Sequence, residues 1–311
     1  MKGISIGVDI GGSHISCAAV HLEEKRFLPD STATHAVNNK AESSEIIAVW
    51  AQTIQKTIDY IGLDAVRGIG FAMPGPFEYH TGIARNAAAN DKYEKMFGVH
   101  VAAALRTALG LTPSFPIRFI NDATAFALGE NWLGKSQGSR ASLSITLGTG
   151  FGSAFLIDGI PAVNGDLVPT SGCLWHIPYR ESIADDYFSS RGLMAAYHQQ
   201  GGGGAQTVRE LAEAVHTDPI ARQVLLHFGH DLGTFLLPWV KKANIEVLVI
   251  GGNISQSFAL FEEPLRQVFF EAGYPLQMAA SELLETASII GSAVLLDDTF
   301  FRRVEPLLPL M

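Results

Sequence analysis

Two glycine-rich turns, each set between short apolar segments, constrain the fold of this chain more than any other feature. The first covers residues 7–13 (GVDIGGS) and the second covers residues 146–153 (TLGTGFGS). A dinucleotide-binding fingerprint would continue into a helix, whereas small and β-branched residues follow both turns here and indicate a second strand. Each turn is therefore expected to close a β-hairpin whose tip offers backbone N–H groups to a phosphate, with glycine allowing close approach of the oxygens.

One such hairpin could be an ordinary tight turn. Two related hairpins about half a chain apart favour a duplicated fold in which both turns bind the same phosphate chain. The predicted order of elements is a β-hairpin followed by helix, strand and helix, and then the same series again. We expect a smaller α/β domain over residues 1–121, to which a C-terminal helix at 297–311 could be added, and a larger α/β domain over residues 122–296.

Composition narrows the class of protein. The 311 residues are 47% hydrophobic and 17% charged, which is typical of a compact enzyme with a large core and not of a disordered chain. The net charge of −9 argues against nucleic acid as a partner, because phosphate backbones are bound by clustered Lys and Arg. Two distant cysteines and no long apolar run predict a cytoplasmic protein without disulfides or a membrane span.

Five segments occur in the order and spacing of a known family. They are GVDIGGSHI, MPGP, FINDATAFALGE, SITLGTGFGSAFLIDG and VLVIGGNIS. In these motifs the chain resembles the ROK family of the actin and hexokinase superfamily over nearly its whole length. The resemblance implies a two-domain ribonuclease H-like fold with an interdomain cleft. It also implies MgATP-dependent phosphorylation of a hexose or hexose derivative, of the glucokinase, N-acetylhexosamine kinase or fructokinase type, and a homodimer.

Asp122 is the candidate catalytic base, because phosphoryl transfer to an alcohol needs a carboxylate within reach of the attacking hydroxyl. It is predicted at a junction between a strand and a helix, so it could instead serve as the N-cap of that helix. The resemblance favours the role of base. Asn121 would then bind a neighbouring sugar hydroxyl, although Asn is also a common turn residue.

The nucleotide side is implied by the same resemblance. Asp9 would orient Mg²⁺ and its waters beside the β- and γ-phosphates, while an Asp before two glycines could also be just a turn residue. The predicted ATP-binding positions are Asp9, Gly11, Gly12, Ser13, Gly148, Thr149, Gly150, Gly152, Gly251 and Gly252. Gly251 and Gly252 resemble the adenosine-binding turn of the family.

The sugar side departs from the family. The family's Glu-x-Gly-His segment is Cys173-Leu-Trp-His176 here, and a thiol is a poor acceptor that carries no charge at neutral pH. No cysteine lies between His176 and Asp185, so no structural zinc is expected, because such a site needs four ligands. His176 could touch the substrate or simply pack in a loop.

Three further positions complete the predicted sugar site. Asp185 stands where the family has a second sugar-binding Glu, although it could equally be an acidic residue at a helix N-terminus. Gly75, in the Pro74-Gly75 turn, is similar to a segment that lines the sugar pocket. Asn90 or Asn86 could bind a hydroxyl.

A competing interpretation is a sugar- or nucleotide-binding regulatory protein of the same fold with weakened catalysis. Cys173 favours it, and so does His14, which stands where a Lys is usual and lacks its fixed charge. Asp122 and Thr149, both intact, oppose it.

Overall fold

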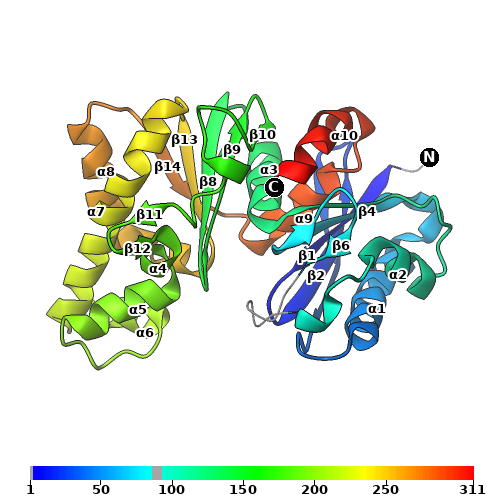
Figure 1. Cartoon of the computed structure of the whole chain (residues 1–311), viewed down its shortest axis with the longest axis horizontal. Helices are drawn as coiled ribbons and strands as arrows, with labels where there is room; N and C mark the ends of the chain where they lie inside the picture. The colour runs from blue at the N-terminus through cyan, green and yellow to red at the C-terminus, as the bar shows by residue number, and fades with distance from the viewer. Residues whose placement is uncertain (1–2, 86–92) are drawn as a thin grey trace. The chain divides into compact units, whose positions relative to one another are not determined.

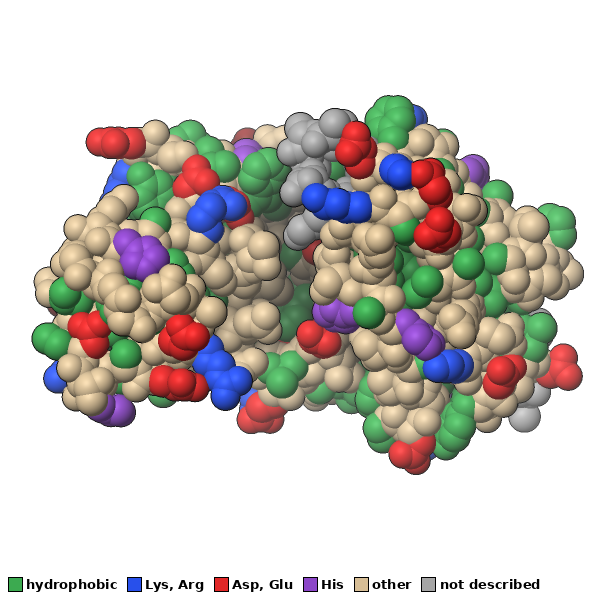
Figure 2. Space-filling view, turned by 90° about the horizontal axis from the view of Figure 1, so that it is seen from below, with side chains coloured by type: hydrophobic (Ala, Val, Ile, Leu, Met, Phe, Trp, Pro, Cys, Tyr) green, Lys and Arg blue, Asp and Glu red, His purple; other side chains and the backbone are tan. Residues whose placement is uncertain are grey.

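The computed structural model describes residues 3–85 and 93–311, which form two compact α/β units. The first unit contains Met1–Leu133 together with Glu285–Met311, and the second contains Gly134–Leu284 (Figure 1). Within the described residues no helix is long and apolar enough to cross a membrane. On the face drawn in Figure 2, Lys and Arg side chains lie among acidic ones instead of forming one continuous basic patch.

The sheet of the first unit contains both predicted hairpin strands and three more. Its order is β3 (Arg26–Ala36), β2 (His14–His21), β1 (Ile4–Ile10), β4 (Val66–Met73) and β7 (Ile117–Asn121). The first three strands pair antiparallel, whereas β1, β4 and β7 run parallel. The antiparallel β1–β2 pair confirms that a hairpin, and not a strand and a helix, surrounds the first turn.

Helices cover both faces of this sheet. They are α1 (Ser43–Ile61), α2 (Val101–Ala108), α3 (Asp122–Leu133), α9 (Glu285–Val294) and α10 (Asp298–Val304). On one face the Cys17 thiol of β2 lies 3.2 Å from the Thr57 hydroxyl of α1. On the other face Gly7 of β1 approaches α9 so closely that a Cβ there would lie 1.8 Å from the Ile289 carbonyl oxygen. Only glycine permits this contact between a helix backbone and a strand backbone.

The boundary between the units differs from the expected one at residue 121. Helix α3 and helix α9 both belong to the first unit, although the sequence placed them with the domain over 122–296. The physical reason is that α9 is almost entirely buried against β1, β4 and α3. Residues 297–311 also lie in the first unit.

The second unit repeats the strand arrangement of the first. Its sheet has the order β10 (Ile160–Ala162), β9 (Phe151–Ile157), β8 (Ala141–Leu147), β13 (Val247–Gly251) and β14 (Gln277–Ala280). The antiparallel β8–β9 pair confirms the second predicted hairpin, and β8, β13 and β14 run parallel. The corresponding order in both units agrees with the expected duplication.

Helices and an aromatic core complete the second unit. The helices are α4 (Ala184–Phe188), α5 (Ser190–Gln199), α6 (Val208–Ala214), α7 (Pro219–Lys242) and α8 (Glu262–Glu271). The Phe188 ring of α4 lies 5.1 Å from Phe235 of α7 and 5.6 Å from Phe151 of β9. Two short ladders pair β5 (Phe77–Glu78) with β6 (Ile83–Ala84) in the first unit and β11 (Pro178–Tyr179) with β12 (Ser182–Ile183) in the second.

Candidate active site

The carboxyl ends of three parallel strands bring four predicted site residues to one edge of the first sheet. Asp9 pairs in register with Ala72, and Met73 pairs with Asn121. Asp9 therefore lies near the end of β1, the Pro74-Gly75 turn follows β4, and Asn121 ends β7 immediately before Asp122. Ligands of open α/β sheets bind outside such strand ends. Residues far apart in sequence are thus positioned at one edge by parallel pairing alone.

The pKa of the Asp9 carboxyl at this edge is strongly raised. Burial raises the pKa of its carboxyl to about 8, and the negative charges of Asp122 and Glu285 contribute to the rise. Glu285 is the first residue of α9, and nothing in its local sequence marks it as part of the site. The docking of α9 on β1 is what makes Glu285 a neighbour of Asp9.

This carboxylate cluster fits an oxygen-coordinated cation such as Mg²⁺. Mutual repulsion between carboxylates is relieved by a divalent cation, and Mg²⁺ prefers oxygen ligands, keeps several waters and uses one or two carboxylates with substrate phosphates. Among residues 3–85 and 93–311, no three His, Cys, Asp or Glu side chains converge closely enough to hold a metal by themselves. The role of Asp9 toward Mg²⁺ stays a prediction.

Asn121, and not Asp122, caps helix α3. The Asn121 side-chain oxygen accepts a hydrogen bond from the Thr124 amide at 3.1 Å, which is the cap geometry. Asp122 accepts from the amide of its own neighbour Ala123 at 2.8 Å and from the Asn121 side-chain amide at 3.0 Å. The interpretation of Asp122 as N-cap is therefore wrong. The side-chain bonds orient its carboxylate instead.

Tyr79 links this pair to the turn after β4, although no local sequence signal marks it. Its buried hydroxyl accepts from the Asn121 amide at 3.2 Å and donates to the Met73 carbonyl at 3.2 Å. A side chain would fit at Gly75, because a Cβ there would lie 3.6 Å from the Tyr79 hydroxyl, an ordinary van der Waals distance. Asn90 and Asn86 lie outside the residues that the structure describes.

The first glycine turn presents amides because its carbonyls are engaged elsewhere. The Gly11 carbonyl accepts from the Tyr93 hydroxyl at 2.7 Å, and the Gly12 carbonyl accepts from the side-chain amide of Asn39. Within the described part of the chain, the N–H groups of Gly12 and Ser13 have no acceptor. Two consecutive amides without acceptors form a concavity suited to an anion.

The second glycine turn has the same arrangement. The Gly148 amide donates to the Gly150 carbonyl at 3.0 Å, and the Gly148 carbonyl accepts from the Ser190 amide at the start of α5. The amides of Thr149 and Gly150 have no acceptor among the described residues, and both residues are exposed. Gly152, which follows, pairs with Thr146 inside the β8–β9 hairpin.

Gly251 and Gly252 lie beside the base of this second turn. Gly251 ends β13 in register with Thr146 of β8. Gly252 has a φ of +78°, and a Cβ there would lie 2.4 Å from the Leu147 carbonyl oxygen. Packing alone thus requires glycine at position 252, and the adenosine-binding role of this pair stays a prediction.

The Cys173–His176 loop is fixed to strand β9. The Leu174 amide donates to the Ser153 hydroxyl at 2.8 Å, and the Cys173 sulfur lies 3.6 Å from Nδ1 of His176. Burial raises the pKa of the Cys173 thiol, so it stays neutral at physiological pH. Trp175 is 49% exposed and stacks edge-on against His176. No third side chain in the described ranges joins Cys173 and His176 to form a metal-binding group.

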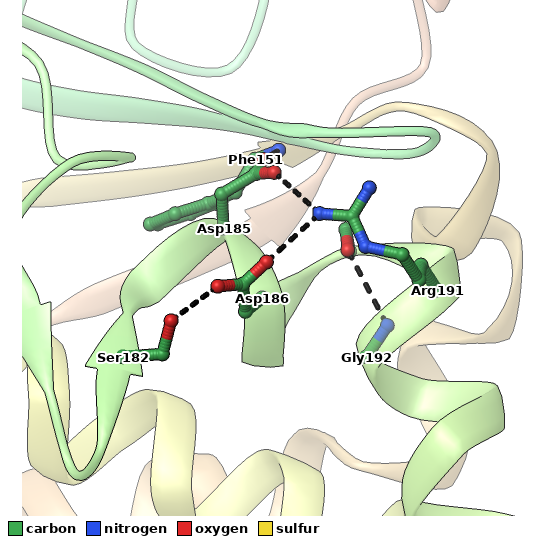
Figure 3. Close-up of polar contacts among 7 residues, drawn as sticks. Phe151, Ser182, Asp185, Asp186, Arg191 and Gly192 are labelled. Atoms are coloured by element: carbon green, nitrogen blue, oxygen red, sulfur yellow. Dashed lines mark hydrogen bonds and ion pairs between the residues drawn. The ribbon is translucent and has the colours of Figure 1, made fainter.

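Asp185 lies against the second glycine turn (Figure 3). One oxygen accepts from the Phe151 amide at 2.7 Å, and the other lies 3.0 Å from the Arg191 guanidinium. Arg191 also contacts Asp186 at 3.0 Å. Asp185 and Asp186 are both in the first turn of α4, as the interpretation of an acidic helix start required.

Along most of its length the chain is similar to sugar kinases and also to a repressor. It is 27% identical to a glucokinase of Thermotoga maritima, over 94% of this chain and 97% of that one. It is 22% identical to a xylose repressor of Caldicellulosiruptor bescii, over 93% of this chain and 77% of that one.

Solved structures share the fold. A ROK family glucokinase from Streptomyces griseus, in complex with glucose and AMPPNP, matches with a TM-score of 0.73 at 23% identity, covering 94% of this chain and 99% of that chain. This likeness confirms the expected actin and hexokinase type of fold. The sequence model of the ROK family matches residues 5–299. The chain therefore belongs to the ROK family.

Proposed function

We propose that this protein transfers the γ-phosphoryl group of ATP to a hydroxyl of a hexose or hexose derivative. The observation that carries the proposal is the convergence of Asp9, Asn121 and Asp122 at one strand edge, with the amides of Gly12 and Ser13 next along the chain from β1. Family membership and the kinase names of the relatives support it.

In the proposed reaction, a carboxylate oxygen of Asp122 accepts the proton of the sugar hydroxyl as that oxygen attacks the γ-phosphorus. The bond from the γ-phosphorus to the bridging oxygen breaks, and ADP leaves with the electron pair. Asn121 keeps the Asp122 carboxylate oriented through its 3.0 Å hydrogen bond. A positioned base of this kind contributes roughly 10²–10⁴-fold to the rate, and most of the remainder comes from electrostatic stabilisation of the phosphates.

The turn amides and Asp9 form the proposed phosphate side. The amides of Gly12, Ser13, Thr149 and Gly150 would donate to phosphate oxygens, and Asp9 would hold Mg²⁺ through its waters. Bound Mg²⁺ would neutralise the phosphate charge that develops during transfer. That both turns bind one nucleotide, in a cleft between the units, is the prediction made from the sequence.

On the sugar side we propose contacts from Asn121, the Gly75 turn and His176. Trp175, with nearly half of its surface exposed, offers a face for the apolar side of a sugar ring. Cys173, as a neutral thiol, cannot replace the hydrogen bonds of a carboxylate. The loop therefore favours an acceptor different from that of members with Glu at this position.

A catalytically weakened regulator is the second candidate. The Cys173–His176 loop favours it, and so does the similarity to a repressor over most of this chain. Its regulatory ligand would be a sugar or a nucleotide, bound at the same residues without turnover.

A coupled ADP-release assay over hexoses, N-acetylhexosamines and fructose separates the two. We expect turnover with at least one sugar, and we expect Asp122→Asn to abolish it while affinity for ATP stays within about twofold. Sugar-dependent thermal stabilisation without turnover on any sugar would contradict the kinase proposal and support the regulator. A cytoplasmic location and a homodimer stay predictions, which cell fractionation and light scattering would test.

A further inference from the structure

The side chain of Asp185 contacts the second glycine turn. Its Oδ1 accepts a 2.7 Å hydrogen bond from the Phe151 amide, which directly follows Gly150. A Cβ on Gly150 would lie 3.1 Å from the same oxygen. The carboxylate therefore lies directly against the peptide that joins Gly150 to Phe151, as Figure 3 shows for Asp185 and Phe151.

This peptide is the point where the turn rejoins strand β9. Phe151 is 2% exposed and pairs with Leu147 at the closed end of the hairpin. A buried amide needs a partner, and Asp185 supplies a charged one. The Phe151 ring also lies 5.6 Å from Phe188, so helix α4 anchors this residue through both its backbone and its side chain. The preceding amides, those of Thr149 and Gly150, are the ones that find no acceptor in residues 3–85 and 93–311.

Arg191 holds the carboxylate in this position. The same terminal nitrogen of Arg191 lies 3.0 Å from an oxygen of Asp185 and 3.0 Å from an oxygen of Asp186. Its positive charge offsets the negative charge that Asp185 would otherwise place beside the proposed phosphate turn. An uncompensated negative charge beside the turn would weaken the binding of an anion there.

The backbone of Asp185 also contacts the proposed sugar loop. Its amide donates to the Trp175 carbonyl at 3.0 Å. Only the main chain makes this contact. The Asp185 side chain points instead at the hairpin, with one oxygen on Phe151 and the other on Arg191. A sugar hydroxyl would therefore have to share an oxygen that already bonds the Phe151 amide or the guanidinium.

We propose that Asp185, braced by Arg191, is a positioning residue for the phosphate-binding turn Gly148–Gly150 and not a sugar ligand. It orients the Gly150–Phe151 peptide, and through it the amides that receive the nucleotide. This inference rests on the proposed function, in which that turn binds ATP.

The test compares Asp185→Ala and Asp185→Asn with the matched control Asp186→Asn. Asp186 bonds Ser182 and Arg191, and its carboxylate makes no hydrogen bond to the turn within the described part of the chain. Each variant is measured for KM of ATP, KM of the best sugar, kcat and, by calorimetry, affinity for a non-hydrolysable ATP analogue.

We expect Asp185→Ala to raise the KM of ATP by about tenfold or more, because losing a hydrogen bond to a charged group changes an equilibrium constant by roughly ten- to a hundredfold. The KM of the sugar should change less than about twofold. Asp185→Asn should fall between Asp185→Ala and wild type, because its amide oxygen can still accept from Phe151. Asp186→Asn should stay close to wild type.

A rise in the KM of the sugar that equals or exceeds the rise for ATP overturns the proposal. So does unchanged affinity for the ATP analogue in Asp185→Ala. If the wild type phosphorylates no sugar, the proposed function fails, but the calorimetric comparison still decides the role of Asp185. If Asp185→Ala does not fold, Asp185→Asn and Arg191→Gln provide the same comparison.

Discussion

Replacing Asp9 by Asn should make the protein increasingly stable relative to wild type as the pH rises, although it removes the proposed cation-binding carboxylate. The pKa of Asp9 is raised from 3.8 to about 8, first by burial and then by the charges of Asp122 and Glu285. Between these two values the folded protein keeps a proton on Asp9 that the unfolded chain releases. The free energy of unfolding of wild type must therefore fall as pH rises through this window. Asn does not titrate.

The size of the effect follows from linkage. Each pH unit inside the window changes the stability contribution of one such group by about 1.4 kcal/mol. From pH 5 to pH 7, the free energy of unfolding of Asp9→Asn should thus gain about 3 kcal/mol relative to wild type. Both pH values lie well inside the interval from 3.8 to about 8.

The assay is urea unfolding at pH 5, 6 and 7 in EDTA, followed by circular dichroism and tryptophan fluorescence. Asp298→Asn serves as the control in the same unit, because the hydrogen bond from Arg118 lowers the pKa of Asp298. That carboxyl is ionised in both the folded and the unfolded protein above pH 5. The difference in free energy of unfolding between Asp298→Asn and wild type should therefore not change with pH. Mg²⁺ at pH 7 should stabilise wild type and leave Asp9→Asn unchanged.

A difference between Asp9→Asn and wild type that stays constant from pH 5 to pH 7 would refute the reasoning. It would mean that Asp9 ionises freely in the folded state. Burial and the neighbouring charges of Asp122 and Glu285 would then not act on the Asp9 carboxyl as inferred.

Three further predictions test other parts of the structure. Gly7→Ala should lower the free energy of unfolding by about 3 kcal/mol or more, because its Cβ would lie 1.8 Å from a backbone oxygen of α9. Gly203→Ala is the control in the same urea titration and should be nearly neutral, because the space around Gly203 is open. Arg118→Ala should lower the free energy of unfolding by about 2 kcal/mol. This mostly buried side chain bonds the Leu295 carbonyl, pairs with Asp298 and stacks on the Phe301 ring. An unchanged midpoint of urea unfolding would contradict this prediction. In a thiol titration, Cys17 should react only after unfolding, because it is fully buried and burial raises its pKa to about 11, and Cys173 should react slowly in the native protein.

The two hairpins could be predicted because their signals are local. Glycines between alternating apolar segments specify a turn and two strands within about fifteen residues, and strand propensity decides against a helix on either side. The same kind of local signal predicted a junction between a strand and a helix at Asp122. The resemblance to the ROK family, and not the order of elements, gave Asp9 and Asp122 roles in one site, and the parallel pairing of β1, β4 and β7 is a finding of the structure.

Contacts between segments distant in sequence could not be predicted from local sequence patterns. Tyr79 and Tyr93 are ordinary tyrosines in sequence, yet their hydroxyls hold Asn121 and the Gly11 carbonyl. The choice between Asn121 and Asp122 as helix cap depended on the side-chain rotamers, because both residue types cap helices well.

The sequence by itself determined the family, the paired glycine turns and the candidate base Asp122. Tertiary structure alone decided that α9 packs on β1, which brings Glu285 to Asp9, and that the Asp185 side chain turns toward Phe151. The physical reason is the range of the interactions. Turns and strands depend on neighbours along the chain, whereas helix docking and side-chain direction depend on the space that distant segments leave, as the bare backbone contact at Gly7 shows.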